Sequence, residues 1–262
     1  MTSPWKAYPL PGDDPLFIRI GSLHLWIRST TDELWLAYRH QESANGAEAT
    51  SEPSAFPVPE DLQWHRWTFS HKSFEFHLRP IFPDLPVVVK PEYPFRVTPE
   101  VRTKIYIRVP LWVQVRLKDT VITEIPSVVL SHTWFGSFTD GELCYWISSA
   151  ARKKIDPDPT RPFLAICPVH IRNRSDEELL VEKICLRVKW LSLYLLEDQL
   201  WANEARVNYR GRESVSEIEV FRRPPPEAPG AKLITPPREE SRSFAAKTFA
   251  SLKELPGLGM LR

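Results

Sequence analysis

Residues 105–117 read IYIRVPLWVQVRL, and two runs of alternating apolar side chains meet within them at Pro110. Alternation with a period of two places successive side chains on opposite faces of an extended strand. Proline lacks a backbone N–H and interrupts a central strand, so Pro110 predicts a corner at which the chain passes from one sheet to another. This stretch therefore favours packed β-sheets over a helical fold.

The same alternation recurs along most of the first 222 residues. One hairpin is predicted within residues 23–38, where two alternating runs flank a polar turn, and a second within residues 67–76. Short strands between turn residues are typical of a sandwich or barrel, and the lack of alternating strands and helices argues against a doubly wound α/β fold. We therefore predict an all-β protein with two immunoglobulin-like β-sandwich units, at residues 1–100 and 101–222.

The composition changes towards the C-terminus. Residues 223–241 are rich in proline, which favours an extended, semi-rigid linker. Residues 242–256 place Phe244, Phe249 and Leu252 near one stripe of a helix, so a short amphipathic helix is predicted there. A helix of this length is marginal alone and needs a surface to cover. That surface could belong to the chain's own sandwich or to a partner, and the sequence leaves both open.

Charge and cysteine content narrow the class of protein. Lys and Arg total 34 and Asp and Glu total 33, so the net charge of +1 gives little attraction for nucleic acid. No signal peptide is recognisable, and no apolar run approaches the ~18 residues that span a bilayer. We therefore expect a soluble protein. Its three cysteines are far apart and form no CxxC pair, so we also expect a reduced, cytoplasmic protein without a cofactor or metal; the three are Cys144, Cys167 and Cys185.

The densest group of reactive side chains lies in residues 130–146, which read LSHTWFGSFTDGELCYW. A hydrolase could use Ser131 or Cys144 as its nucleophile and His132 as its base. Neighbouring residues of a strand point to opposite faces, however, and the glycine elbow that exposes a nucleophilic serine is absent. We therefore expect two strands joined by an aromatic-rich turn at Asp140–Gly141, and we assign no catalytic residue.

A carbohydrate-binding module is a further alternative, since the chain has ten tryptophans. Exposed aromatic rings on one sheet face stack on sugar rings. Trp64 with Trp67, or Trp134 with Trp146, could form such a pair. Large aromatic side chains also fill cores, so the alternative depends on their exposure.

Three segments together resemble a known family: residues 130–145, then CPVHIRN at residues 167–173 and LSLY at residues 191–194. The pattern is similar to that of an uncharacterised prokaryotic family, the domain of unknown function number four-three-two. The resemblance covers roughly residues 85–240, and its most specific part is the TWFG…GELCY pattern. It implies no catalytic residues. It does imply a gene-neighbourhood association with small-conductance mechanosensitive channels.

Our leading hypothesis is a non-enzymatic accessory protein that binds another protein, which could be such a channel, and so could be associated indirectly with a membrane. The rival is a hydrolase-like enzyme centred on His132 and Cys144, with Asp140 and Glu142 nearby. The oligomeric state is left open. The residues that we expect to contact a ligand or partner are His132, Trp134, Phe135, Asp140, Glu142, Tyr145, Phe244, Phe249 and Leu252.

Overall fold

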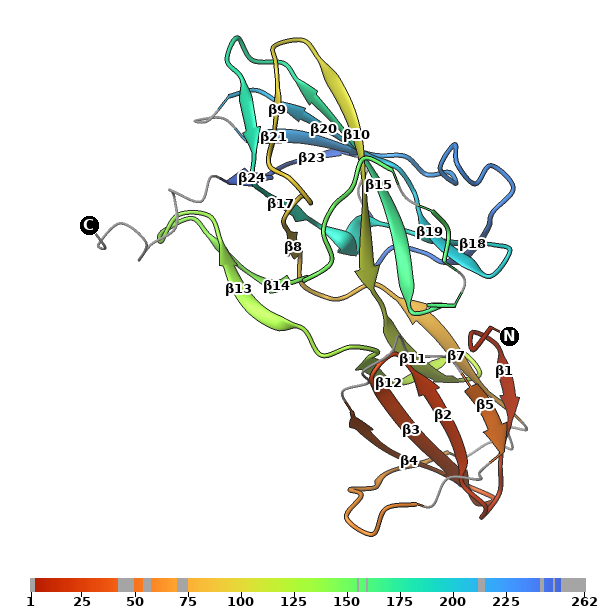
Figure 1. Cartoon of the computed structure of the whole chain (residues 1–262). Helices are drawn as coiled ribbons and strands as arrows, with labels where there is room; N and C mark the ends of the chain where they lie inside the picture. The colour runs from red at the N-terminus through yellow and green to blue at the C-terminus, as the bar shows by residue number, and fades with distance from the viewer. Residues whose placement is uncertain are drawn as a thin grey trace.

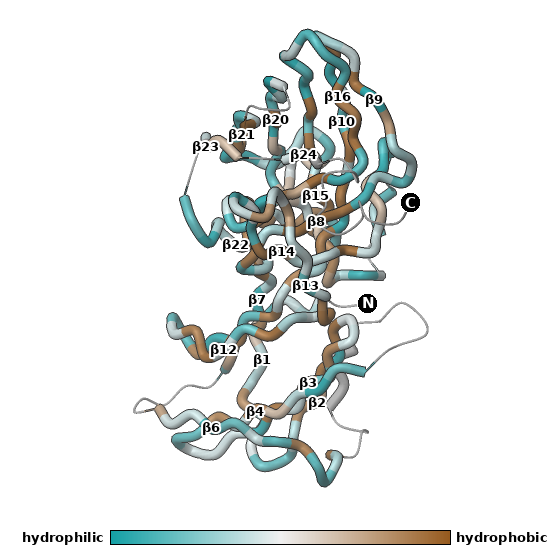
Figure 2. The backbone as a smooth tube through the Cα atoms, turned by 90° about the vertical axis from the view of Figure 1, so that its left-hand side faces the viewer, coloured by the Kyte–Doolittle hydropathy of each residue, from teal (hydrophilic) through white to brown (hydrophobic). Residues whose placement is uncertain are grey.

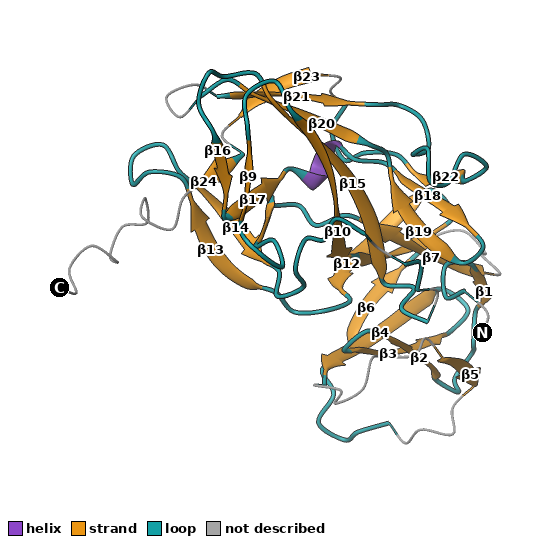
Figure 3. Ribbon diagram, turned by 45° about the horizontal axis from the view of Figure 1, so that its top comes forward, coloured by secondary structure: helices purple, strands orange, loops and turns teal. Residues whose placement is uncertain are grey.

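The structure, a computed structural model, is built almost entirely of β-strands arranged in two lobes (Figures 1 and 3). Among the described residues, helical structure is limited to the short 3-10 turn η1 (Val188–Trp190), and no helix could cross a membrane. The prediction of an all-β, sandwich-like fold is confirmed. The described residues are 3–41, 50–53, 58–69, 75–154, 156–158, 160–211, 215–240, 243–246 and 248–250.

The N lobe is a sandwich of two antiparallel sheets whose apolar faces meet in one core. Its first sheet has the order β1 (Ala7–Pro9), β7 (Glu75–Ile81), β11 (Trp112–Leu117), β12 (Thr120–Pro126). Its second sheet has the order β5 (Thr50–Pro53), β2 (Leu16–Ile20), β3 (Leu23–Ser29), β4 (Glu33–His40), β6 (His65–Thr68).

The C lobe packs an eight-stranded sheet against a five-stranded one. The larger sheet has the order β22 (Lys232–Thr235), β18 (Leu193–Leu196), β19 (Gln199–Ala202), β15 (Leu164–Asn173), β20 (Ala205–Tyr209), β21 (Ser216–Val220), β23 (Ser243–Ala246), and β10 (Arg102–Pro110) also pairs with β15. The smaller has the order β13 (Ser131–Phe135), β14 (Glu142–Trp146), β8 (Val87–Val89), β17 (Lys183–Leu186), β24 (Phe249–Ala250). A ribbon of β9 (Phe95–Val97) and β16 (Leu179–Val181) completes the lobe.

One extended segment belongs to both lobes. β10 pairs with β15 along its whole length, from Arg102 to Pro110, and β11 then pairs with β7 and β12 in the N lobe. Pro110 therefore marks the change of sheet that the sequence predicts. Leu111 at the crossing is fully buried, and its N–H donates to the carbonyl of Phe163 at 2.9 Å.

Because of this crossing, the sheets do not divide the chain at the predicted boundary between residues 100 and 101. β8 and β9 precede that boundary and lie in the C lobe, whereas β11 and β12 follow it and lie in the N lobe. The chain crosses between the lobes after β7, after β10 and after β12 (Figure 1). Pairing between strands, and not continuity of sequence, sets the division.

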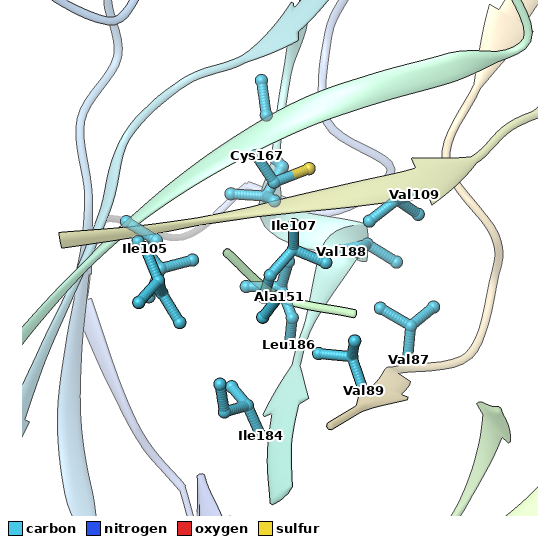
Figure 4. Packing of buried hydrophobic residues seen from close by; sticks show 14 of the residues in the cluster. Val87, Val89, Ile105, Ile107, Val109, Ala151, Cys167, Ile184, Leu186 and Val188 are labelled. Atoms are coloured by element: carbon cyan, nitrogen blue, oxygen red, sulfur yellow. The ribbon is translucent and has the colours of Figure 1, made fainter. Parts of the chain in front are cut away.

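The C-lobe core is made by the alternate side chains of β10 and β15 on one side and of β8 and β17 on the other. Figure 4 shows Ile105, Ile107 and Val109 of β10 directed towards Val87 and Val89 of β8, and Figure 2 shows the apolar strands concentrated inside the lobe. Ile107 and Val109 have no exposed surface. Burying an apolar side chain of this size contributes roughly 1.5–3 kcal/mol, so this layer contributes strongly to the stability of the lobe.

The predicted hairpins have different outcomes. The first is confirmed, since β3 and β4 pair antiparallel through Leu23↔His40 to Ser29↔Leu34. The second is wrong, because β6 pairs with β4 whereas β7 pairs with β1 and β11 in the opposite sheet. The chain between β6 and β7 thus connects the two sheets of the sandwich, and closeness in sequence did not imply pairing.

The proline-rich segment lies against the C lobe. Its Ala228 is fully buried in a small cluster on the outer face of the eight-stranded sheet. The carboxylate of Glu227 accepts a hydrogen bond from the hydroxyl of Tyr106 at 2.7 Å and pairs with the ammonium of Lys104. Further on, residues 232–235 form β22, so the segment predicted as a linker over residues 223–241 is packed against the fold as far as it is described.

The prediction of a helix over residues 242–256 is wrong, because the described part of this segment is extended. β23 pairs with β21, and β24 pairs with β17. A short helix gains little in isolation, whereas two open sheet edges offer backbone partners, so pairing overrides the helical spacing. Phe249 is buried in the C-lobe core, and its ring meets that of Tyr209 edge-on at 6.0 Å. Leu252 lies outside the described residues.

Removing the buried side chain of Ile107 tests the C-lobe core. We expect Ile107→Ala to lower the free energy of unfolding by about 2–5 kcal/mol, because a cavity replaces packed apolar atoms. Val121→Ala is the control, since Val121 is 43% exposed and its truncation should change stability by less than about 0.5 kcal/mol. Urea denaturation measures both, and equal effects of the two substitutions would contradict the assignment of the core.

Acid titration tests the contact between Glu227 and the sheet. Burial alone would raise the pKa of Glu227, but hydrogen bonds from Lys104 and Tyr106 outweigh it and hold the pKa below its ordinary value of 4.5. A carboxylate with a lowered pKa in the folded state stabilises the fold at neutral pH, and this contribution is lost as the pH falls through that lowered value. We expect Glu227→Gln to be less stable than wild type at neutral pH, and the difference to shrink in acid. Glu240→Gln, at a carboxylate whose side chain is 75% exposed, should follow the wild type throughout.

Candidate functional site

The hairpin of β13 and β14 holds most of the residues that the sequence predicts as a binding site. The two strands pair antiparallel from Ser131↔Trp146 to Phe135↔Glu142, and their turn contains Asp140. The Asp140 carboxylate accepts hydrogen bonds from the hydroxyls of Ser137 at 3.2 Å and Thr139 at 3.0 Å. Asp140 therefore shapes the turn, as the Asp140–Gly141 signal predicts.

Glycine is required at the next position of this turn. A Cβ atom at Gly141 would lie 2.1 Å from the Nε1 atom of Trp134. That indole N–H donates to the carbonyl of Ser137 at 2.9 Å, so the ring of Trp134 is held against the turn. The aromatic side chain and the glycine together fix the form of the hairpin tip.

The pairing register divides the predicted residues between two faces of the hairpin. His132, Trp134 and Tyr145 lie on one face, which we call the aromatic face together with Leu143. Phe135, Glu142, Cys144 and Trp146 lie on the other, which we call the thiol face. This list follows from the pairs His132↔Tyr145, Trp134↔Leu143, Thr133↔Cys144 and Phe135↔Glu142.

The hydrolase centre of the rival hypothesis is therefore not assembled among these residues. His132 is exposed on the aromatic face, 5.1 Å between ring centroids from Tyr145, whereas Cys144 is fully buried on the opposite face. A nucleophile and its base need to be within hydrogen-bond reach of each other. Ser131 also lies on the face away from His132, so neither candidate nucleophile has this base beside it.

The sugar-binding alternative loses one of its two pairs for the same reason. Trp134 lies on the aromatic face and Trp146 on the thiol face, so they cannot stack on one sugar ring. In the N lobe, the guanidinium of Arg28 lies 4.6 Å from the ring centre of Trp64. Trp67 is half-buried against the N-lobe core. These rings are engaged in packing within the chain.

The thiol face contains a compact group that links β14 to β17. The Sγ atoms of Cys144 and Cys185 are 3.9 Å apart, and both residues are buried. The carboxylate of Glu142 pairs with the guanidinium of Arg187, whose side chain is 7% exposed. Burial, and then the bond to Cys144, raise the pKa of Cys185 well above its usual range. At neutral pH this thiol is therefore protonated.

Glu142, Cys144 and Cys185 are also the described residues whose ligand atoms come close enough to hold a metal, all lying within 4.8 Å of one another. A soft cation prefers thiolate ligands. Here the carboxylate is already occupied by Arg187, and the guanidinium places a positive charge beside the thiols. The group as it stands is a pair of buried thiols next to an ion pair whose guanidinium is buried and whose carboxylate is partly exposed, and it joins two strands of the smaller sheet.

The aromatic face is packed against the C lobe at the base of the hairpin and exposed to solvent at its tip. At its base, Tyr145 packs against the C-lobe core, and its hydroxyl donates to Asp84 at 3.1 Å. Burial, and then the charge of Asp84, raise the pKa of Tyr145 to about 12. Towards the tip the same face is open, with Trp134 43% and Leu143 46% exposed, and Phe138 in the turn is 84% exposed.

A family model described as a protein of unknown function (DUF432) matches residues 4–253. The chain belongs to this family. The resemblance noted in the sequence is thus confirmed, and the DUF432 match extends over both lobes, beyond the roughly 85–240 that the sequence motifs cover. No curated protein and no solved structure matches the chain.

Sequence reasoning found the hairpin of this DUF432 protein but not what surrounds it. Cys185 and Arg187 were not connected to Cys144 and Glu142, because they lie more than forty residues away in the chain. The alternation of side chains along a strand could have predicted that Cys144 and His132 lie on opposite faces of the hairpin. No sequence signal places β17, which is separated from β14 by β8, close enough to bring Cys185 to Cys144. Of the C-terminal candidates, Phe249 belongs to the core, and the backbone of Phe244 lies in β23.

Labelling with a thiol reagent tests the burial of the cysteines. We expect none of Cys144, Cys167 and Cys185 to react with a disulfide-exchange reagent in the native protein, because all three are buried. In concentrated guanidinium chloride all three should react. A Thr139→Cys variant, which puts a thiol in the exposed turn, is the positive control. Rapid native labelling of Cys144 or Cys185 would contradict the closed thiol face.

Proposed function

We propose that this protein is a non-enzymatic accessory protein that binds another protein through the tip of the β13–β14 hairpin. The observation that supports the proposal is the open end of the aromatic face, where Trp134, Leu143 and Phe138 expose large apolar side chains close together in one hairpin. Clustered exposed apolar residues, aromatic ones above all, are typical of protein-binding surfaces.

The position of the hairpin in its sheet supports the same proposal. β13 is the outermost strand of the five-stranded sheet, and the hairpin extends beyond the body of the C lobe (Figure 1). An edge strand offers backbone donors and acceptors to an added strand. A partner could therefore pair with β13 and cover the apolar side chains of the aromatic face at the same time.

The turn gives this surface a fixed form. Trp134 is tied to the carbonyl of Ser137, and Asp140 is bonded to two neighbouring hydroxyls. A surface that is already ordered loses less conformational entropy when it binds. His132 adds a polar group on the same face. In this proposal the predicted contact residues His132, Trp134 and Tyr145 belong to the binding face, and Asp140 orders the turn.

The first partner to test is a small-conductance mechanosensitive channel, which the family resemblance suggests. The cytoplasmic side of such a channel would be the side available to a cytoplasmic protein. The support for this part of the proposal is the resemblance alone, so the channel and the hairpin need separate readouts.

Binding of the purified channel, held in lipid nanodiscs, to immobilised protein tests both parts. We expect Phe138→Ser with Leu143→Ser to weaken binding at least about tenfold, because central apolar contacts dominate interface energies. Tyr93→Ser is the matched control, since Tyr93 is 78% exposed but lies outside the hairpin.

The outcomes separate the two parts of the proposal. Failure of the wild type to bind the channel would remove the channel as partner, and equal binding by the hairpin variant would remove the hairpin as the surface. A chain ending at residue 250 retains every described strand, so it also tests whether residues 251–262 contribute.

A further inference from the structure

A cavity of about 450 Å³ lies where the two lobes meet, away from the hairpin. Its walls come from the N-terminal segment, from β7, β18 and β22, and from β11 with the turn that follows it. Figure 3 shows β7, β18 and β22 near one another on one side of the molecule. Sites for small ligands commonly have volumes of roughly 300–1,000 Å³ and lie between domains. The size and position of this cavity are therefore those of a ligand site.

The lining is strongly cationic. Four basic side chains line the cavity, and of the described residues around it only Asp119 contributes a carboxylate; the four are Lys6, Arg79, Arg116 and Lys118. His77 also lies at the wall, but its Nε2 atom is 3.1 Å from a carboxylate oxygen of Glu75. For a chain with a net charge of +1, this is a marked local concentration of positive charge.

The cations are held in place by contacts that leave charge available. Arg79 donates from Nε to the carbonyl of Ile234 at 2.8 Å and to the hydroxyl of Thr235 at 3.1 Å, which are neutral acceptors. Arg116 likewise donates to the side-chain oxygen of Gln114 and to the backbone carbonyl of Asp119. Neither guanidinium is neutralised by these bonds. Burial is the main cause that lowers the pKa of Arg79, and the nearby charge of Arg116 lowers it further.

The remaining wall is apolar. Trp5, Leu78, Leu195 and Ile234 line the cavity, and the indole N–H of Trp5 donates to the carbonyl of Pro162 at 2.9 Å. This bond fixes the orientation of the ring. The cavity therefore offers a cluster of cations on one part of its surface and an ordered aromatic and aliphatic wall on another.

We propose that this cavity binds a small organic phosphate, a molecule that joins one or more phosphate groups to an apolar or aromatic body. The guanidinium groups of Arg79 and Arg116 provide planar donor pairs that match phosphate oxygens, and Lys6 and Lys118 add mobile positive charge. The apolar wall beside Trp5 receives the rest of the ligand. Because Arg79 belongs to the N lobe and Ile234 to the C lobe, a bound ligand contacts both lobes and stabilises their arrangement.

Calorimetric titration of the full chain with pyrophosphate and with adenosine diphosphate, at constant ionic strength, tests the proposal. We expect both to bind and to raise the melting temperature. The double variant Lys6→Ala with Lys118→Ala should bind at least about tenfold more weakly, since it removes two charged hydrogen-bond donors to the phosphate. Both lysines are exposed, so the fold should be unaffected, which circular dichroism checks.

Lys153→Ala is the matched control. Lys153 is exposed and lies 5.7 Å from the ring centre of Phe95, much as Lys6 lies 5.2 Å from that of Tyr8, but it is not part of the cavity. This variant should bind as the wild type does. Vesicles that contain phosphatidic acid form a separate arm: binding to these alone, lost in the double lysine variant, supports the phosphate chemistry and assigns its source to a lipid headgroup.

Three results would overturn the proposal. The first is no binding of either phosphate compound or of the vesicles, and the second is equal affinity in the double lysine variant and the wild type. The third is equal affinity for citrate and pyrophosphate, which would show an unselective cationic surface. None of these results bears on the hairpin, so this inference and the proposed function succeed or fail independently.

Discussion

The strand that runs from β10 into β11 contributes side chains to both hydrophobic cores, and the arrangement of the two lobes depends on this shared burial. Ile105, Ile107 and Val109 fill the C lobe, and Val113 and Val115 fill the N lobe after the crossing at Leu111. A segment buried at both ends cannot rotate freely at its middle. The crossing therefore fixes the lobes more firmly than an exposed linker would.

Contacts from the far end of the chain reinforce that arrangement. Thr235 donates its hydroxyl to the carbonyl of Pro80 at 2.6 Å, and Arg238 donates to Phe82 and to the carboxylate of Glu124. Residues 235–238 thus connect the two lobes a second time, in addition to the crossing from β10 to β11. The cationic cavity lies beside this junction, so its shape is a consequence of how the lobes are joined. The β13–β14 hairpin, by contrast, lies at the free edge of the smaller sheet.

The sequence predicted local features well and long-range ones poorly. Alternation at Leu23–Ile27 and Ile105–Leu117 identified strands, and Pro110 identified a change of sheet, because each of these depends on one segment alone. Pairing depends on which segments meet. Residues 67–76 resembled a hairpin yet lead into opposite sheets, and residues 243–246 had helical spacing yet complete a sheet edge.

The same limit applies to the sites. The hairpin is one continuous segment and was found, whereas the pairing of Cys144 with Cys185 and the cavity lined by Lys6, Arg79 and Lys118 join distant parts of the chain.

Native-state hydrogen exchange along residues 103–117 tests the shared strand most directly. Amides that open only with the whole fold exchange slowest. If one buried strand serves both lobes, the paired amides of β10 and of β11 should exchange with similar, near-global protection, and both sets should respond equally to denaturant. Exchange of the β11 amides that is orders of magnitude faster than that of the β10 amides would show that the lobes open separately and would contradict this account.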